Sequence, residues 1–166
     1  MPKQTHQYIF VALLSLMMLS ACQKKPVPAP DVTFQLINGS KISLSERQGK
    51  PTLVVFWATT CMSCLKEIPH FIQLYQKYKA KGLEIIAVAM PYDRPDHVVE
   101  MQKAKSIPYP VALDIKADVV RAFGNVSITP NSFLISSNGI IIKHHIGLWD
   151  ITELSNLIRT ELNTKG

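Results

Sequence analysis

The sequence predicts an α/β fold, with a central mixed β-sheet flanked by helices and a β-hairpin extension at the N-terminal side. Apolar runs that suit buried strands alternate with helix-like patterns in the first half of the domain, as in units with parallel strands. Later, two strand-like runs flank the Asn138-Gly139 pair, which is typical of a tight antiparallel hairpin. Parallel pairs together with an antiparallel hairpin make a mixed sheet.

The composition is that of one folded domain with a short appendage. The chain has 166 residues, of which 47% are hydrophobic, so a core of ordinary size can form. The formal charge of +6 comes from 18 basic and 12 acidic residues, and the basic residues are scattered apart from the doublet Lys24-Lys25. We see no basic stripe with interleaved aromatic residues, and we therefore expect no nucleic-acid binding.

The first 21 residues have the pattern of a signal peptide. After Lys3 and His6, an apolar run of 12 residues extends from Tyr8 to Leu19, whereas a membrane-spanning helix needs about 20. The run closes with Leu19-Ser20-Ala21-Cys22, which resembles the lipobox of bacterial lipoproteins. The alternative is an ordinary cleaved signal peptide with a chance cysteine. We expect Cys22 to be lipidated and to become the mature N-terminus.

The predicted mature chain consists of a tether and one domain. Residues 22–31 hold the lipidated cysteine and a proline-rich segment, which is typical of an extended spacer. The domain is expected over residues 32–166, without an internal repeat. This organisation predicts an extracytoplasmic protein that is anchored to a membrane by lipid, in the periplasm of a Gram-negative cell or on the outer face of the membrane otherwise.

Periodicity and turn signals predict the elements in the first half of the domain. Alternation in Val32–Leu44 around an Asn-Gly pair predicts a hairpin. Thr52–Trp57 is apolar on both faces, as expected of a central parallel strand. Apolar residues recur every three or four positions in Met62–Lys81, which predicts a helix that Pro69 kinks and Gly82 ends.

Shorter elements are predicted in the second half. Leu83–Met90 has the pattern of a second buried strand. Asp150 is suited to cap a last helix over residues 151–162, and Glu153 stands at the capping-box position. The remaining predicted elements are helices over Asp96–Lys105 and Ala117–Phe123 and strands over Val111–Leu113, Ser132–Ser136 and Ile140–Ile146.

Cys61 and Cys64 form a C-x-x-C where the Thr52–Trp57 strand meets the following helix. A thiol at a helix N-terminus faces free N–H groups and the positive end of the helix dipole, which lowers its pKa and favours the reactive thiolate. Cys64 lies one turn inward, where it can attack the Cys61 sulfur. The alternatives are half of a zinc site, for which no second ligand pair is present, and an inert disulfide, whose loop would restrain the unfolded chain little.

Four motifs follow one another along the chain, which are Phe56–Cys64, Glu67-Ile68-Pro69, Tyr109–Asp114, and Ile128–Ile135 followed by Asn138-Gly139. With these motifs the chain resembles the thioredoxin superfamily, and within it the membrane-tethered TlpA/ResA-like branch, over about residues 32–163. The sequence departs from the pattern of the branch at Thr60, where a second tryptophan is usual, and at Ser63, where a proline is common. It departs again at Asn131-Ser132, where the branch has two threonines.

The resemblance implies roles for particular residues. Cys61 would be the nucleophile and Cys64 the resolving cysteine. Glu67, on the helix face of Cys64, would shuttle a proton to or from the buried thiol, although its spacing also suits a solvated helix acid. Pro130 would be the cis-proline that packs opposite the dithiol, and Thr129 would offer its backbone groups to an extended substrate.

Other residues near the dithiol have more ordinary interpretations. Many thioredoxins place a buried aspartate two residues before the tryptophan, but Val55 occupies that position here. Trp57 is expected to be a core residue or a wall of the substrate-binding site. His144 and His145 lie on a predicted strand and should face opposite ways, so they cannot easily bind one metal ion. We expect neither a metal site nor a cofactor.

The predicted function is therefore a lipid-anchored thiol–disulfide oxidoreductase. The resemblance implies a monomeric reductant of disulfides in exported proteins, with apocytochrome c awaiting haem as one candidate, that is regenerated by a membrane dithiol donor. One alternative is a disulfide oxidase or isomerase. An alternative of another class is a metal-binding chaperone of related fold, although a two-residue gap between the cysteines suits exchange better.

Overall fold

The computed structural model describes residues 25–164. The predicted signal peptide of residues 1–21 and the predicted lipidation site Cys22 lie outside these residues. In chain order the elements are β1 (Val27–Pro28), β2 (Thr33–Gln35), β3 (Lys41–Ser43), the 3-10 helix η2 (Ser45–Arg47), β4 (Thr52–Trp57), α2 (Met62–Tyr78), the 3-10 helix η3 (Lys79–Lys81), β5 (Glu84–Ala89), α3 (Pro95–Ala104), β6 (Val111–Leu113), α4 (Asp118–Ala122), β7 (Asn131–Ile135), β8 (Ile140–Ile146) and α5 (Ile151–Asn163).

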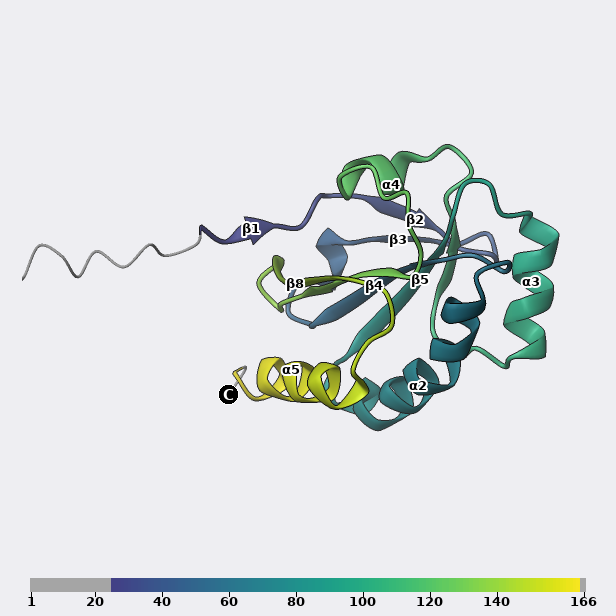
Figure 1. Ribbon diagram of the computed structural model, residues 1–166. Coiled ribbons are helices and arrows are strands. Elements are labelled where there is room, and N and C mark those ends of the chain that lie inside the picture. Colours follow the sequence, from purple (N-terminus) through teal and green to yellow (C-terminus); the bar gives the residue numbers. More distant parts are fainter. Residues whose placement is uncertain (1–24, 165–166) are drawn as a thin grey trace, which may run out of the picture.

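Six of the strands form one sheet in the order β1-β8-β7-β4-β5-β6, and the sheet is mixed, as the sequence predicted (Figure 1). The central strand β4 runs parallel to β5 and antiparallel to β7. The strand β6 continues the parallel side, and β8 continues the antiparallel side. The carboxyl end of β4 leads into α2, so residues 58–61 form the connection between this strand and the N-terminus of the helix.

Alternating side chains of β4 enter two separate cores. Leu53, Val55 and Trp57 pack against α2 and α5 on one face of the sheet. Val54 and Phe56 pack on the opposite face. All six residues of the strand are buried, which agrees with the expectation that it is apolar on both faces.

The helix α2 runs over most of the predicted range. It contains Pro69 and changes direction along its length, as expected of a helix that holds an interior proline (Figure 1). The predicted end is a 3-10 turn, η3, which closes at Gly82 in the left-handed conformation with a φ of 107°. Glycine adopts this conformation without a steric cost, which explains why the helix ends there.

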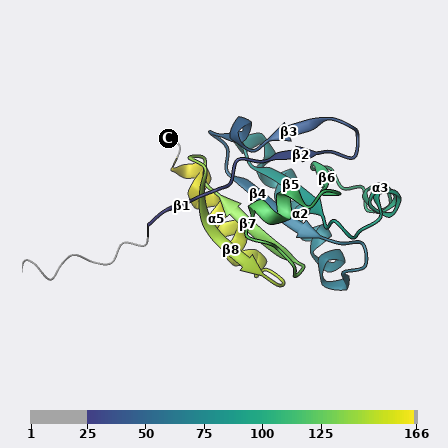
Figure 2. The ribbon, with the colours of Figure 1, turned by 90° about the horizontal axis from the view of Figure 1, so that it is seen from above.

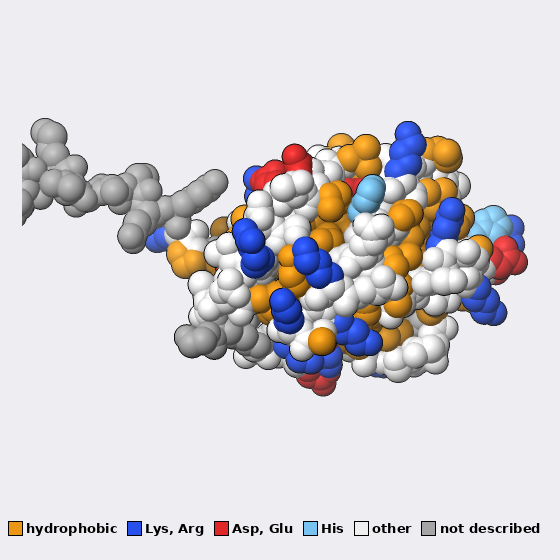
Figure 3. Space-filling model, turned by 90° about the horizontal axis from the view of Figure 1, so that it is seen from below, with side chains coloured by type: hydrophobic (Ala, Val, Ile, Leu, Met, Phe, Trp, Pro, Cys, Tyr) orange, Lys and Arg blue, Asp and Glu red, His pale blue; other side chains and the backbone are white. Residues whose placement is uncertain are grey.

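Basic side chains cover part of the face that α2 and α5 form. Figure 3 shows this face, on which Lys and Arg side chains outnumber acidic ones. Lys77 lies 4.9 Å from the centre of the Tyr78 ring, and Lys79 lies 5.2 Å from that of Tyr75. These lysines place their charge over the aromatic rings of α2 and keep the ammonium groups in solvent.

The β2–β3 hairpin and α4 cover the other face. Phe56 of the sheet meets Phe123 and Phe133 with ring centres 5.4 and 6.0 Å apart, in edge-to-face arrangements. The hairpin lies beside β6, and it is joined there by a hydrogen bond of 3.0 Å from the Ile37 N–H to the Val111 carbonyl (Figure 2). The hairpin predicted around an Asn-Gly pair is therefore confirmed.

The start of the folded region differs from the expectation. We expected residues up to 31 to form a tether, but Val27 and Pro28 pair with Ile141 and Ile140 of β8. The Ala29 N–H continues this ladder by donating to the Gly139 carbonyl at 2.8 Å. An edge strand has one unpaired side, so it accepts prolines that a central strand would exclude.

Between residues 25 and 164 no helix combines the length and the apolar character that crossing a membrane requires.

Candidate active site

Cys61 and Cys64 form a disulfide at the N-terminus of α2. Cys61 is the N-cap residue, and its Sγ accepts a hydrogen bond of 3.2 Å from the Cys64 N–H. Cys61 is partly exposed, whereas Cys64 is only 3% exposed and belongs to the core below α2. Another protein can therefore reach the sulfur of Cys61 but not that of Cys64.

The electrostatic surroundings of Cys61 favour a thiolate. Its sulfur faces the first N–H groups of a 17-residue helix, and the first turn carries no acidic side chain. The Ser63 hydroxyl lies 3.4 Å from the sulfur as an additional polar neighbour. Such surroundings lower the pKa of a free thiol, so cleavage of the disulfide would leave the negative charge on Cys61.

The turn before Cys61 is held by Asp93, a contact that the sequence alone did not predict. Asp93 lies in the loop after β5, and its carboxylate accepts hydrogen bonds from both the N–H and the hydroxyl of Thr59, each at 2.6 Å. The only sequence signal was its place after the carboxyl end of a strand parallel to β4. Asp93 thus fixes the backbone that presents Cys61.

The peptide bond between Thr129 and Pro130 is cis, as the resemblance implied. The bond directly precedes β7, and Asn131 of β7 pairs with Phe56 near the end of β4. This register places the cis bond at the end of the sheet from which α2 begins. Pro130 is buried, Thr129 is partly exposed, and Ile128 is 59% exposed beside them.

Glu67 is buried rather than solvated, with an exposure of 2%. Its Oε1 accepts a hydrogen bond of 2.8 Å from the Trp149 N–H. Burial raises the pKa of the carboxyl group, and the hydrogen bond from Trp149 and the charge of His145 offset part of that increase. The interpretation of Glu67 as a solvated helix acid is therefore wrong, and its raised pKa makes the carboxylate a stronger base than that of an ordinary glutamate.

A small cavity joins Glu67 to the buried cysteine. Its lining includes Cys64, Glu67, Trp57 and Tyr109, and its volume is about 10 Å³. This is about the space that one buried water needs. Burial and the nearby charge of Glu67 raise the pKa of Tyr109, so the phenol stays neutral and remains a donor.

Trp57 forms an inner wall of this site. Its side chain is 3% exposed, and its indole N–H has no hydrogen-bond partner among the residues that the structure describes. Direct contact between this side chain and a substrate does not fit such burial. Trp57 is therefore a core residue, which is one of the two interpretations that the sequence left open, and it lies behind the disulfide.

The two histidines of β8 face opposite ways, as predicted. His144 stacks on Phe133 and lies 2.8 Å from the Asn131 side-chain oxygen, whereas His145 stacks on Trp149. Within residues 25–164, no three side chains of the types His, Cys, Asp and Glu are grouped in a way that would hold a metal ion.

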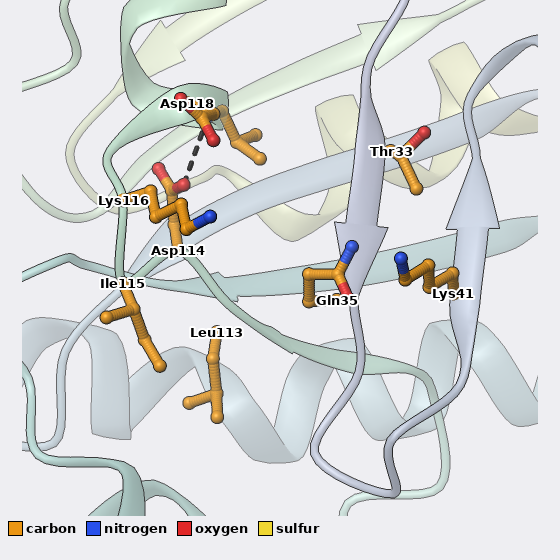
Figure 4. A pocket seen from close by; sticks show the side chains of 9 residues that line it. Thr33, Gln35, Lys41, Leu113, Asp114, Ile115, Lys116 and Asp118 are labelled. Atoms are coloured by element: carbon orange, nitrogen blue, oxygen red, sulfur yellow. Dashed lines mark hydrogen bonds between the residues drawn. The ribbon is translucent and has the colours of Figure 1, made fainter.

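A larger pocket of about 400 Å³ lies away from the disulfide, between the hairpin and the segment after β6 (Figure 4). Its lining includes Gln35 and Asp114 but neither cysteine. The Asp114 carboxylate accepts hydrogen bonds from the N–H groups of Val119 at 3.1 Å and Val120 at 2.8 Å. The aspartate of the third sequence motif therefore has a structural task, which is to satisfy the start of α4.

The chain is similar to known thiol-disulfide oxidoreductases. A family model described as Redoxin matches residues 24–157. The thiol-disulfide oxidoreductase ResA of Bacillus thuringiensis subsp. konkukian (strain 97-27) is 37% identical over 116 residues, covering 69% of this chain and 65% of that protein. ResA of Bacillus subtilis (strain 168) is 35% identical over 115 residues, covering 69% of this chain and 63% of that protein. The matches thus span just under two thirds of these relatives.

A solved structure shares the whole architecture. The crystal structure of a thiol:disulfide interchange protein, a thioredoxin family protein from Chlorobium tepidum TLS, superposes with a TM-score of 0.77 at 25% sequence identity. The superposition covers 85% of this chain and 99% of that one. The observed fold therefore agrees with the thioredoxin-like fold that the resemblance implied.

Proposed function

Because the chain belongs to the Redoxin family of the thioredoxin superfamily, we propose that it is a thiol–disulfide oxidoreductase acting through Cys61 and Cys64. The observation that carries the proposal is the asymmetry of the disulfide at the start of α2. Cys61 is partly exposed at a helix N-terminus, and Cys64 is buried one turn behind it. Exchange requires this arrangement, because one sulfur must reach the partner and the other must wait until the partner is bound.

In the reducing direction, the reaction proceeds in two steps. The Cys61 thiolate attacks one sulfur of a substrate disulfide, which forms a mixed disulfide and expels the other substrate sulfur as a thiolate that takes up a proton. Cys64 then loses its proton and attacks the Cys61 sulfur, which forms the disulfide seen here and releases the second substrate thiol. Two electrons pass from the protein dithiol to the substrate.

Glu67 is placed to receive the proton of Cys64. Both residues line the same small cavity. With its raised pKa, the carboxyl group is a stronger base than an ordinary glutamate. Glu67 would therefore assist the second step, in which the buried thiol must become a thiolate.

The surroundings of Cys61 suit an extended protein segment as substrate. Met62 follows Cys61 and is 69% exposed, and Ile128, beside the cis peptide bond, is 59% exposed, while Thr129 is partly exposed. Apolar side chains and free backbone groups bind an extended chain with little sequence selection. The substrates we propose are disulfides of exported proteins, including apocytochrome c.

The N-terminal segment supports the proposed location. A short apolar run that ends in a lipobox-like Cys22 favours export followed by lipid anchoring. Only residues 23–26 separate the proposed lipid site from β1, so the domain would act close to the membrane surface. There a membrane dithiol donor could restore the reduced state.

Trapping of the reaction intermediate tests the proposed chemistry. In cells that express a Cys64→Ser variant, Cys61 should remain joined to its substrate in a mixed disulfide, because the residue that resolves it is missing. Non-reducing electrophoresis followed by mass spectrometry would identify the partner. A Cys61→Ser variant is the matched control and should trap nothing. Equal recovery of partners from both variants would contradict the proposal.

The direction of electron flow is tested by the reduction potential of the Cys61–Cys64 pair. Equilibration of the purified protein with glutathione buffers should give a potential well below that of the strongly oxidising members of this superfamily, whose value is about −120 mV. A value as high as that would instead favour the oxidase or isomerase alternative.

Labelling with a fatty-acid analogue, with Cys22→Ser as the control, tests the lipid anchor.

A further inference from the structure

Residues 147–149, in the loop between β8 and α5, contact two parts of the site at once. The Gly147 N–H donates to the carbonyl of Pro130 at 2.9 Å, next to the cis peptide bond. The Trp149 N–H donates to Glu67 at 2.8 Å. One short loop therefore connects the segment that would bind the substrate to Glu67, the acid that would receive the proton of Cys64.

The indole of Trp149 holds this loop from both sides. Its Nε1–H donates to the hydroxyl of Ser132 at 2.6 Å. The ring also stacks on the imidazole of His145, with ring centres 4.2 Å apart. The Nε2 of His145 in turn lies 3.0 Å from the Leu148 carbonyl, so the histidine also restrains the loop. Trp149 is buried, and these contacts leave it little freedom.

We propose that Trp149 is a positioning residue, whose indole is fixed by Ser132 and His145 so that its backbone N–H holds the carboxyl group of Glu67 in place for the Cys64 thiol. The indole thereby influences the pH at which the second step of exchange becomes fast. This inference rests on the proposed function. It adds a chain of contacts, from Ser132 through Trp149 to Glu67, that connects β7, the 147–149 loop and α2.

The proposed effect depends on one buried hydrogen bond, from the Trp149 N–H to the Glu67 carboxyl group. An N–H donor stabilises the ionised form of a carboxyl group that water does not reach. If the indole loses its anchor, the loop can shift and this bond lengthens. The carboxylate of Glu67 then becomes less stable, and it ionises only at a higher pH.

Three titratable groups face Glu67 from the elements packed around it. Cys64 lies on its own helix, Tyr109 comes from the segment before β6, and His145 comes from β8. Tyr109 stays neutral below the alkaline range because its pKa is raised. His145 and Cys64 remain in all the variants described below.

Two substitutions remove the same hydrogen bond from its two ends. Trp149→Phe keeps an aromatic ring for the stack on His145 and keeps the backbone N–H, but it lacks the indole donor. Ser132→Ala keeps the indole but removes its acceptor. The matched control is Tyr78→Phe, which removes a hydrogen bond of 2.9 Å to Ser155 between α2 and α5, remote from Glu67.

The measurement follows the purified full-length protein, in detergent and reduced, as it reacts with an aromatic disulfide that releases a coloured thiolate. The first release reports the attack by Cys61, and the second reports the attack by Cys64. Both phases are recorded from about pH 5 to about pH 9, a range that covers the titration of a perturbed carboxyl group and of histidine.

We expect both site variants to move the midpoint of the second phase to higher pH and to slow this phase about fivefold at neutral pH, as the loss of one hydrogen bond would. The first phase and the Tyr78→Phe control should match the wild type. The double variant should show little more than either single variant, because both remove one bond. Unchanged pH profiles in Trp149→Phe and Ser132→Ala would overturn the inference. The proposed function would fail separately, if the wild type released no thiolate or depended on neither cysteine.

Discussion

Two buried carboxyl groups lie in different regions of this protein, and their surroundings differ in kind. Asp114 and Glu67 are 4% and 2% exposed. Asp114 accepts two N–H groups from residues five and six positions further along the chain, at the start of α4. Glu67 accepts one N–H in the described structure, from Trp149, which is 82 residues away.

The difference lies in how well each buried carboxyl group is supplied with hydrogen-bond donors. Asp114 satisfies the unpaired N–H groups of a helix start, and those groups in turn stabilise its charge. Glu67 has fewer hydrogen-bond donors to offset the cost of its burial, so its pKa is raised. It also lines the same cavity as Cys64, the residue whose proton it would receive. Burial alone does not distinguish the two carboxyl groups, whereas the number and origin of their hydrogen-bond donors do.

The largest effect on stability should come from Asp114→Ala. This substitution leaves the buried N–H groups of Val119 and Val120 without their acceptor, so we expect unfolding to require about 3 kcal/mol less free energy. Urea unfolding of the oxidised protein measures this loss. The exchange rate of the molecules that remain folded should not change, and a loss of that rate would show that the aspartate region takes part in the chemistry.

The opposite result is expected for Glu67→Gln. The amide oxygen can still accept the Trp149 N–H, so the free energy of unfolding should stay within about 1 kcal/mol of the wild-type value. The attack by Cys64 should slow by about 10- to 100-fold, because the neutral amide cannot take its proton. Stopped-flow measurement of the second thiolate release provides the rate. A wild-type rate in this variant would contradict the role proposed for Glu67.

The stability of the oxidised protein should fall as the pH rises through the titration of Glu67. A carboxyl group with a raised pKa in the folded state binds its proton more tightly there than in the unfolded state, so ionisation above its ordinary pKa favours unfolding. The slope for one group is at most about 1.4 kcal/mol per pH unit. The difference between urea unfolding curves of wild type and Glu67→Gln, taken from pH 4 upward, isolates this contribution. A flat difference would mean that the pKa is not raised.

The smallest change in the free energy of unfolding is expected for an exposed carboxylate. Glu153 forms an ion pair with Lys143 at 3.2 Å, and both side chains are nearly half exposed. Glu153→Gln should change the free energy of unfolding by about 0.3 kcal/mol and leave exchange unaffected. Measured beside the other two variants, it calibrates how much of their effect comes from burial. A cost near that of Asp114→Ala would undermine the comparison.

The agreement between sequence and structure is closest where the signal is local. The hairpin signals, the central strand and the helix ended by Gly82 depend on neighbours within a few residues, and the structure confirms them. Asp150 caps α5 as predicted, accepting the N–H groups of Thr152 and Glu153, although Glu153 pairs with Lys143 instead of completing the box. The pairing of Val27 and Pro28 with β8 was missed, because a strand of two residues with one proline carries no periodicity.

The amino-acid sequence by itself determined the order of the elements and the position of the dithiol, because helix, strand and turn preferences and the C-x-x-C spacing act over short distances. Only the tertiary structure decided that Trp57 lies behind the disulfide and that Glu67 is buried beneath it. It also decided that Trp149 and Asp93 belong to the site. These properties depend on which side chains the folded chain brings together and how much water it excludes, and neither is a property of any single segment.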